Sequence, residues 1–146
     1  MEFTHNPDLK TDLAKMRKEY SDQDFDLKDL PKDGNPFTLF NEWLEEAKKA
    51  NVIEPNAMNL ATVGDNGRPV SRFVLLKEVK PNGFVWFTNY ESRKGSDLAA
   101  NPYGALCFWW GLLERSVRLE GTVSRLSDAE SDEYWAKRPR GAKIGA

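Results

Sequence analysis

The sequence contains very few of the residues that usually form metal sites and nucleophilic catalytic sites. Its 146 residues include one histidine, His5, and one cysteine, Cys107. One histidine and one cysteine cannot form a Cys/His zinc site, and a Ser-His-Asp triad would have to use a histidine next to the N-terminus. A single cysteine also excludes a disulfide within the chain, which is typical of proteins from reducing compartments. The composition therefore predicts no metal site.

Several targeting and phosphate-binding signals are also missing. The motifs GxGxxG and GxxxxGK[ST] do not occur, so any phosphate must be bound by cations and helix ends. No apolar run approaches the roughly 20 residues of a membrane helix. The polar, acidic start MEFTHNPDLK is unlike a secretory signal. Because the net charge is only -2, no overall field draws the chain to nucleic acid or to a membrane. We therefore expect a cytoplasmic protein that binds neither.

The pattern of the first 35 residues differs from that of the rest. Residues 9–20 are charged, with a thin apolar stripe at helical spacing, which predicts a helix. Residues 21–33 are acidic, and we expect this linker to be mobile. A better helix starts at Pro36, with Asn35 as its N-cap. We therefore divide the chain into an N-terminal helix with its linker, residues 1–35, and one domain, residues 36–146.

Five short strands are predicted in the domain, over residues 57–63, 68–79, 83–90, 103–110 and 115–127. The turns between them include GDNG and KPNG, and this spacing predicts an antiparallel meander closed into a small barrel. The fold class is therefore mainly β with flanking helices (α+β). The runs RFVLL and ALCFWW are apolar on both faces. We expect the barrel interior to cover one face and a helix or a second subunit to cover the other.

Two cations open a short predicted helix in the stretch NYESRKGSDLAANP. Ser92 is the expected N-cap, so Arg93 and Lys94 fall in the first turn, where the helix dipole favours negative charge. A bound phosphate would remove this conflict, because the helix N–H groups and both cations would point at one anion. The alternative is a solvated turn with no ligand.

Other cations fall at strand ends and near the C-terminus. Arg72 and Lys77 lie five positions apart on one predicted strand and so project from opposite faces. Each needs an anionic partner if both faces are covered, and each is otherwise a solvated rim residue. Tyr134 and Arg138 share one face of a last helix that begins at Ser127 with the capping box SDAE. They could clamp a phosphate, although spacing alone favours simple packing. The basic run KRPRGAK could also contact nucleic acid, but it is short and the chain is acidic overall.

The order of these motifs resembles the pyridoxine (pyridoxamine) 5′-phosphate oxidase family. The motifs are RxVLLK, WFTNYESRKG, NPYGALCFWW, RxVRLEG, YWAKRPR and IGA, and the resemblance runs from about residue 36 to the end. It implies an FMN-binding split β-barrel that works as a homodimer, with FMN between the subunits. It also implies oxidation of pyridoxine or pyridoxamine 5′-phosphate to pyridoxal 5′-phosphate, with O₂ reduced to hydrogen peroxide, as a step of pyridoxine biosynthesis.

The resemblance carries site residues over to this sequence. FMN contacts are implied at Arg72, Phe73, Val74, Leu75, Phe87, Thr88, Arg93 and Lys94. Arg93 and Lys94 match the pair that holds the FMN phosphate. Substrate contacts, largely to its phosphate, are implied at Lys77, Tyr134 and Arg138. No catalytic side chain is implied, because the cofactor carries the hydride chemistry.

This sequence departs from the family pattern in three places. Ser116 stands where the family usually has glutamine, and Ala142 and Lys143 stand where it usually has serine and glutamine. Family members also continue past IGA with further FMN contacts and an Arg-x-His element on the substrate. We therefore expect a fragment or a short form, whose FMN binding survives better than its oxidase activity. The alternatives are a non-catalytic short paralogue that binds FMN or pyridoxal phosphate, and a split-barrel flavoprotein with another substrate.

Overall fold

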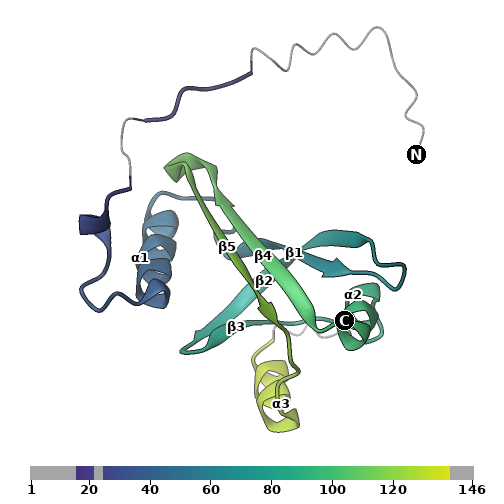
Figure 1. The fold of residues 1–146 in the computed structure, drawn as a ribbon. Helices are drawn as coiled ribbons and strands as arrows, with labels where there is room; N and C mark the ends of the chain where they lie inside the picture. The colour runs from purple at the N-terminus through teal and green to yellow at the C-terminus, as the bar shows by residue number, and fades with distance from the viewer. Residues whose placement is uncertain (1–15, 22–24, 139–146) are drawn as a thin grey trace, which may run out of the picture.

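The computed structural model describes residues 16–21 and 25–138. One curled sheet carries helix α1 (Pro36–Lys49) at one end and helix α2 (Arg93–Ala100) at the other, with helix α3 (Asp128–Lys137) beyond strand β3 (Figure 1). Two short 3-10 helices, η2 (Leu27–Asp29) and η3 (Gly111–Leu113), complete the described helices. This architecture confirms the predicted class, mainly β with flanking helices. No helix in the described ranges is long and apolar enough to cross a membrane.

The sheet contains β1 (Ala57–Val63), β2 (Pro69–Lys80), β3 (Gly83–Trp86), β4 (Tyr103–Trp110) and β5 (Arg115–Thr122). Their order is β3-β2-β1-β4-β5, and every pairing is antiparallel. Three pairings join strands that are consecutive in the sequence, and the fourth joins β1 to β4. Within the described residues β3 and β5 are edges that do not pair with each other, so the sheet is a half-barrel. The closure predicted from the turn spacing is not made.

Strands β1 and β4 begin and end where the sequence predicts, whereas β3 and β5 end earlier. β3 stops at Trp86, which faces Leu76; β2 itself continues back to Pro69, but among the described residues that part pairs only with β1. β5 stops at Thr122 because β4 begins at Tyr103, which faces Thr122. A strand continues only while it has a hydrogen-bonding partner, and the sequence of β3 or β5 alone does not contain that information.

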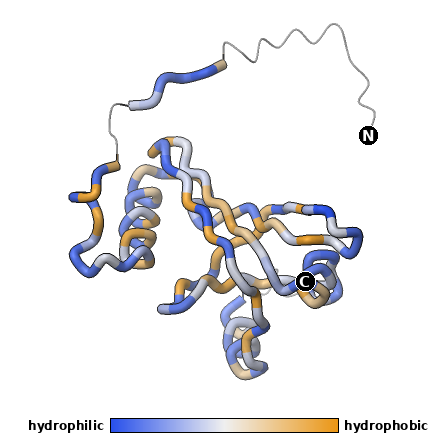
Figure 2. The backbone as a smooth tube through the Cα atoms, viewed as in Figure 1, coloured by the Kyte–Doolittle hydropathy of each residue, from blue (hydrophilic) through white to orange (hydrophobic). Residues whose placement is uncertain are grey.

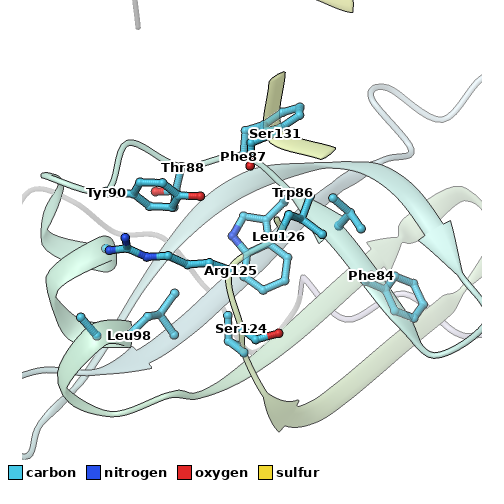
Figure 3. A pocket seen from close by; sticks show the side chains of 14 residues that line it. Phe84, Trp86, Phe87, Thr88, Tyr90, Leu98, Ser124, Arg125, Leu126 and Ser131 are labelled. Atoms are coloured by element: carbon cyan, nitrogen blue, oxygen red, sulfur yellow. The ribbon is translucent and has the colours of Figure 1, made fainter. Parts of the chain in front are cut away.

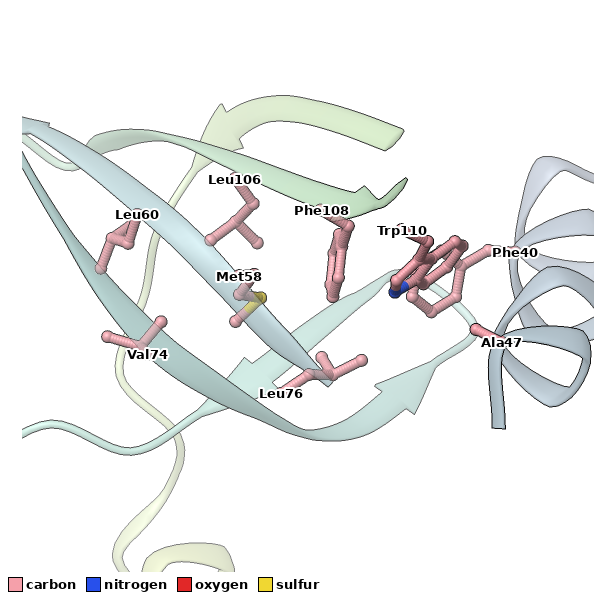
Figure 4. Packing of buried hydrophobic residues seen from close by; sticks show 9 residues of the cluster. All are labelled: Phe40, Ala47, Met58, Leu60, Val74, Leu76, Leu106, Phe108 and Trp110. Atoms are coloured by element: carbon pink, nitrogen blue, oxygen red, sulfur yellow. The ribbon is translucent and has the colours of Figure 1, made fainter. Parts of the chain in front are cut away.

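The core lies on the concave face of the sheet (Figure 4). It consists of Phe40, Ala47, Met58, Leu60, Val74, Leu76, Leu106, Phe108 and Trp110. Alternate residues of β1, β2 and β4 point into it, as strand geometry requires. Helix α1 adds Phe40, whose ring centre lies 5.0 Å from that of Phe108. The indole N–H of Trp110 donates to the Pro55 carbonyl at 2.8 Å, which satisfies the one polar atom of this large side chain.

The residues between these core positions form the other face of the sheet, which we call the outer face. One row across it is Phe73, Asn59, Cys107 and Arg118, in adjacent register on β2, β1, β4 and β5. Apolar side chains remain open there: Phe73 is 76% exposed and Trp109 is 59% exposed. Much of the apolar colour of the molecule lies along these strands, whereas the turn between β1 and β2 is hydrophilic (Figure 2). The described chain alone does not cover this face.

The helix predicted over residues 9–20 is not formed in the part of it that the structure describes. Residues 16–20 have no regular secondary structure, and residues 9–15 of the predicted helix lie outside the described part. A charged stretch with one thin apolar stripe has little surface to bury, so propensity alone does not sustain a helix. The linker contains the unpredicted η2, capped by Asp26. Phe25 packs edge-on against Trp43 of α1, with ring centres 5.7 Å apart.

Helix α2 packs closely against the loop that precedes it. A Cβ at Gly95 would lie 2.3 Å from the Tyr90 carbonyl oxygen and 2.8 Å from its carbonyl carbon. These are backbone atoms of a tight turn, so they cannot rotate away as a flexible side chain would. The glycine therefore sets the distance between the start of α2 and residues 87–90.

We expect Gly95→Ala to lower the free energy of unfolding by about 1–3 kcal/mol, the usual cost of forcing extra atoms into a packed site. Gly121→Ala is the matched control, because a Cβ at Gly121 meets nothing within 4 Å. Urea denaturation of both variants checks this expectation. Equal midpoints for the two variants would contradict the tight packing described for Gly95.

Candidate functional site

The first turn of α2 carries two cations and no carboxylate. Ser92 is the N-cap, as predicted: its hydroxyl accepts from the Gly95 N–H at 3.4 Å and donates to the Asn89 carbonyl at 2.5 Å. Arg93 and Lys94 follow directly, and the first turn has no acidic residue. The N-terminus of α2 therefore combines two positive side chains with the positive end of the helix dipole.

A pocket of about 570 Å³ opens beside this turn, between the end of β3, α2 and α3. We call it the α2–α3 pocket. Its lining residues are Phe87, Thr88, Asn89, Tyr90, Lys94, Ser131, Asp132, Trp135 and Arg138. Four of these, Phe87, Thr88, Lys94 and Arg138, are predicted site residues from three separate stretches of sequence. The fold therefore brings part of the predicted site together.

A smaller pocket of about 210 Å³ adjoins the first and shares Phe87, Thr88, Tyr90 and Ser131 with it. Its wall is mostly apolar and includes Trp86, Leu98, Val123 and Leu126. Figure 3 shows Arg125 reaching across toward Tyr90, and its guanidinium carbon lies 4.1 Å from the centre of that ring. This contact joins the segment after β5 to the loop before α2.

The two predicted substrate residues have aromatic partners, but they do not share one helical face as predicted. Tyr134 lies within α3, whereas Arg138 is its C-cap and has an extended backbone. The Tyr134 ring packs edge-on against Phe87, with ring centres 5.0 Å apart, which places the tyrosine next to the pocket. The Arg138 guanidinium lies 5.3 Å from the centre of the Trp135 ring, so this arginine partly covers the tryptophan, as the packing alternative expects. Arg138 nevertheless also lines the α2–α3 pocket. Ala142 and Lys143 lie outside the described residues.

The predicted residues of β2 divide between three environments. Arg72 enters a polar network under α2. Val74 is in the core, so its side chain is unavailable to a ligand and only its backbone could make the implied contact. Phe73, Leu75 and Lys77 are exposed on the outer face or at the bulge that follows it. The α2–α3 pocket therefore does not gather the β2 residues.

Arg72 is held by a network that links β1, β2 and α2. Its Nη1 donates to the Thr62 hydroxyl at 2.7 Å and to the Leu60 carbonyl at 3.2 Å. The Thr62 hydroxyl donates in turn to Asp97 Oδ2 at 2.9 Å, and Arg72 Nη2 lies 3.5 Å from the same oxygen. Asp97 is only 5% exposed. Arg72 therefore has the anionic partner that a covered cation requires.

Sequence reasoning did not single out Asp97 or Thr62. Thr62 shares the inward register of Met58 and Leu60, so strand alternation could have identified a buried hydroxyl there. Asp97 lies four residues after Arg93 and faces the sheet, but its partner could not be read from α2 alone. Arg93 itself lies near the turn between β1 and β2: its Nη2 would be 3.4 Å from a Cβ at Gly64.

An ion pair anchors the start of α3. Glu130 pairs with Lys80 of β2 and also accepts from the Ser127 hydroxyl at 2.9 Å in the predicted capping box. The Lys80 ammonium and the Ser127 hydroxyl together lower the pKa of Glu130 from 4.5 to about 2, and Glu130 raises the pKa of Lys80. A lowered carboxyl pKa stabilises the fold above pH 4.5, and this contribution is lost as the pH falls toward 2. The contact therefore ties the first turn of α3 to β2 at neutral pH. The described residues contain no group of side chains that could hold a metal ion.

The family model of pyridoxamine 5′-phosphate oxidase matches residues 44–146. The chain belongs to this family. It is 55% identical over 136 residues to a pyridoxine/pyridoxamine 5′-phosphate oxidase of Burkholderia ambifaria, with 93% of this chain and 63% of that protein covered. It is 49% identical to one from a Cyanothece species, with 92% and 62% covered. The chain thus spans about 63% of the length of the curated relatives it matches.

Two solved structures share the fold. PhzG from Burkholderia lata, in complex with tetrahydrophenazine-1-carboxylic acid, superposes with a TM-score of 0.72 at 30% identity, over 77% of this chain and 55% of that one. An FMN-binding protein related to pyridoxamine 5′-phosphate oxidase, from Nostoc punctiforme, gives a TM-score of 0.64 at 19% identity, over 74% and 61%. Both support the split-barrel fold that the motifs imply.

Proposed function

We propose that this chain forms the FMN-binding part of an oxidase that converts pyridoxine or pyridoxamine 5′-phosphate to pyridoxal 5′-phosphate, with O₂ reduced to hydrogen peroxide. Sequence similarity and the geometry of α2 both support this proposal. The relatives that bear this name are up to 55% identical over 93% of the chain. The observation that carries the proposal is the first turn of α2, which has two cations and no carboxylate, and whose Lys94 lines a pocket of about 570 Å³.

The residues at α2 fit the phosphate of FMN. The N-terminal N–H groups of a helix bind phosphate oxygens, and arginine and lysine side chains add charge-assisted hydrogen bonds. Arg93 and Lys94 would hold the phosphate, and Phe87 and Thr88 would contact the flavin. Bound FMN would supply the hydride and electron-transfer chemistry of the reaction. The protein therefore needs to bind, orient and shield the reactants.

The remaining predicted residues have distinct proposed roles. Arg72 would approach the FMN phosphate from beneath α2, and the exposed β2 residues Phe73 and Leu75 would line the outer side of the cofactor. Val74 would contribute through its backbone. Lys77, Tyr134 and Arg138 would bind the substrate, mainly through its phosphate.

We also propose that a second copy of the chain covers the outer face. Phe73 and Trp109 are mostly exposed there, and the row from Phe73 to Arg118 passes through the half-buried Asn59 and Cys107. Exposed apolar patches of this kind usually mark protein interfaces. A homodimer would bury these side chains and would place the β2 residues opposite a partner. A cytoplasmic location, and no binding to nucleic acid or membranes, stay predictions from the composition.

One observation favours a second candidate function, a flavoprotein of the same fold with another substrate. PhzG, at 30% identity, is solved with tetrahydrophenazine-1-carboxylic acid. Fold alone does not fix the substrate. Ser116, which replaces the usual family glutamine, lies on β5 opposite Trp109 on the outer face. The higher identity to the pyridoxine/pyridoxamine 5′-phosphate oxidases favours the first candidate.

The test of the proposed function uses the purified chain with added FMN. A flavin absorption band that stays with the protein through gel filtration would support cofactor binding. Peroxide release on addition of pyridoxamine 5′-phosphate would support the oxidase, and release only with other reductants would support the second candidate. Flavin binding without peroxide from any donor would support a non-catalytic module. A protein that takes up no FMN would contradict all three.

The double variant Arg93→Ala/Lys94→Ala tests the phosphate contact. We expect its FMN dissociation constant to rise by about 100-fold, because each charge-assisted hydrogen bond contributes on the order of 1.5–3 kcal/mol. Riboflavin, which lacks the phosphate, should bind the variant and the unaltered chain equally. Flavin fluorescence titration measures both constants. A variant that keeps its FMN affinity and merely melts at a lower temperature would show that the two cations are only a solvated turn.

The variant Trp109→Glu tests the dimer. A charge in the centre of an apolar interface should shift the sedimentation coefficient from dimer to monomer, because the buried carboxylate would be unpaired. The matched control is Leu112→Glu, which places a charge at an exposed residue of η3. Analytical ultracentrifugation of both variants would distinguish them. A monomeric unaltered chain would contradict the proposed homodimer.

A further inference from the structure

Asp97 is a buried carboxylate that none of the roles above uses. It is 5% exposed and sits in the middle of α2, four residues after Arg93. Charged groups are rarely buried to this extent unless they are paired. Asp97 is paired, but its partners belong to the sheet: Thr62 of β1 and Arg72 of β2. It therefore links the helix that carries Arg93 and Lys94 to the strand that carries Arg72.

We propose that Asp97 is a positioning residue. It fixes the Arg72 guanidinium relative to the first turn of α2, so that both can bind the same phosphate. This inference rests on the proposed binding of FMN. The Thr62 hydroxyl links the two side chains, since it accepts from Arg72 at 2.7 Å and donates to Asp97 at 2.9 Å. A hydroxyl in both roles fixes the direction of each bond.

The donor inventory of Arg72 supports this role. A guanidinium has five N–H donors in a rigid planar fork. The described contacts engage only Nη1 and Nη2, toward Leu60, Thr62 and Asp97. Once these contacts fix the plane, the direction of the remaining N–H groups is fixed as well. Without Asp97, the side chain could rotate about its flexible stem.

The negative charge of Asp97 and its positioning of Arg72 have opposite effects on the binding of an anion. A carboxylate near a phosphate site weakens anion binding, so its removal should tighten FMN binding if charge alone mattered. If position matters more, its removal should weaken FMN binding. The sign of the change therefore separates the two effects.

We expect Asp97→Ala in the full chain to raise the FMN dissociation constant by about tenfold, the loss expected for one mispositioned charge-assisted contact. Riboflavin affinity should stay within about twofold of the unaltered chain. Asp97→Asn keeps an oxygen that accepts from Thr62 and Arg72, so it should restore most of the FMN affinity. Asp128→Ala, which removes an exposed carboxylate from the first turn of α3, is the charge-matched control.

A second variant, Thr62→Val, tests the proposal even if Asp97→Ala does not fold. It removes the linking hydroxyl without changing charge, and it should reproduce the selective loss of FMN affinity. Fluorescence titration with FMN and riboflavin, alongside thermal melting, measures every variant. Equal losses for both flavins would show a purely structural role and overturn the proposal, as would unchanged or tighter FMN binding. An unaltered chain that binds no FMN would instead refute the proposed function, and this inference with it.

Discussion

The contact between Asp97, Thr62 and Arg72 joins β1 and β2 to α2, the helix that carries Arg93 and Lys94. A buried ion pair adds little net stability compared with an apolar core, but removing one partner costs about 3–5 kcal/mol, since the other charge is left buried. The network is therefore better understood as a device that fixes position. It sets α2 against β1 and β2, and Gly95 then lets the preceding loop approach the helix closely.

Local chemistry allowed much of the fold to be predicted. Strands β1 and β4 were predicted with the bounds that the structure has, and the caps Asn35, Ser92 and Ser127 each accept from a backbone N–H of the first helical turn. The errors lie where a partner far away decides the outcome. The ends of β3 and β5 depend on where β2 and β4 begin to pair. Residues 16–20 form no helix, because one thin apolar stripe offers little surface to bury.

The candidate site was only partly predicted, because contacts between distant segments also decide where its residues lie. The motif RFVLLK reads as one functional block, yet strand alternation sends its residues to different places. Val74 and Leu76 build the core, whereas Phe73 and Leu75 point outward. The motif therefore serves packing and the outer face together. Sequence spacing could not reveal that Arg72 meets Asp97, because that contact depends on how α2 docks across β1.

The charges around α2 favour one kind of ligand over others. Arg72 faces Asp97, so this pair contributes little net charge, whereas Arg93 and Lys94 form no ion pair within the described residues. The helix dipole adds about half a positive charge, which gives roughly +2.5 in all. A phosphate monoester carries about −1.5 to −2 near pH 7. It would balance this charge more fully than a carboxylate or a phosphodiester, each of which carries about −1. The position of cations at the wrong end of a helix dipole is therefore understandable if the ligand is a phosphate monoester such as that of FMN.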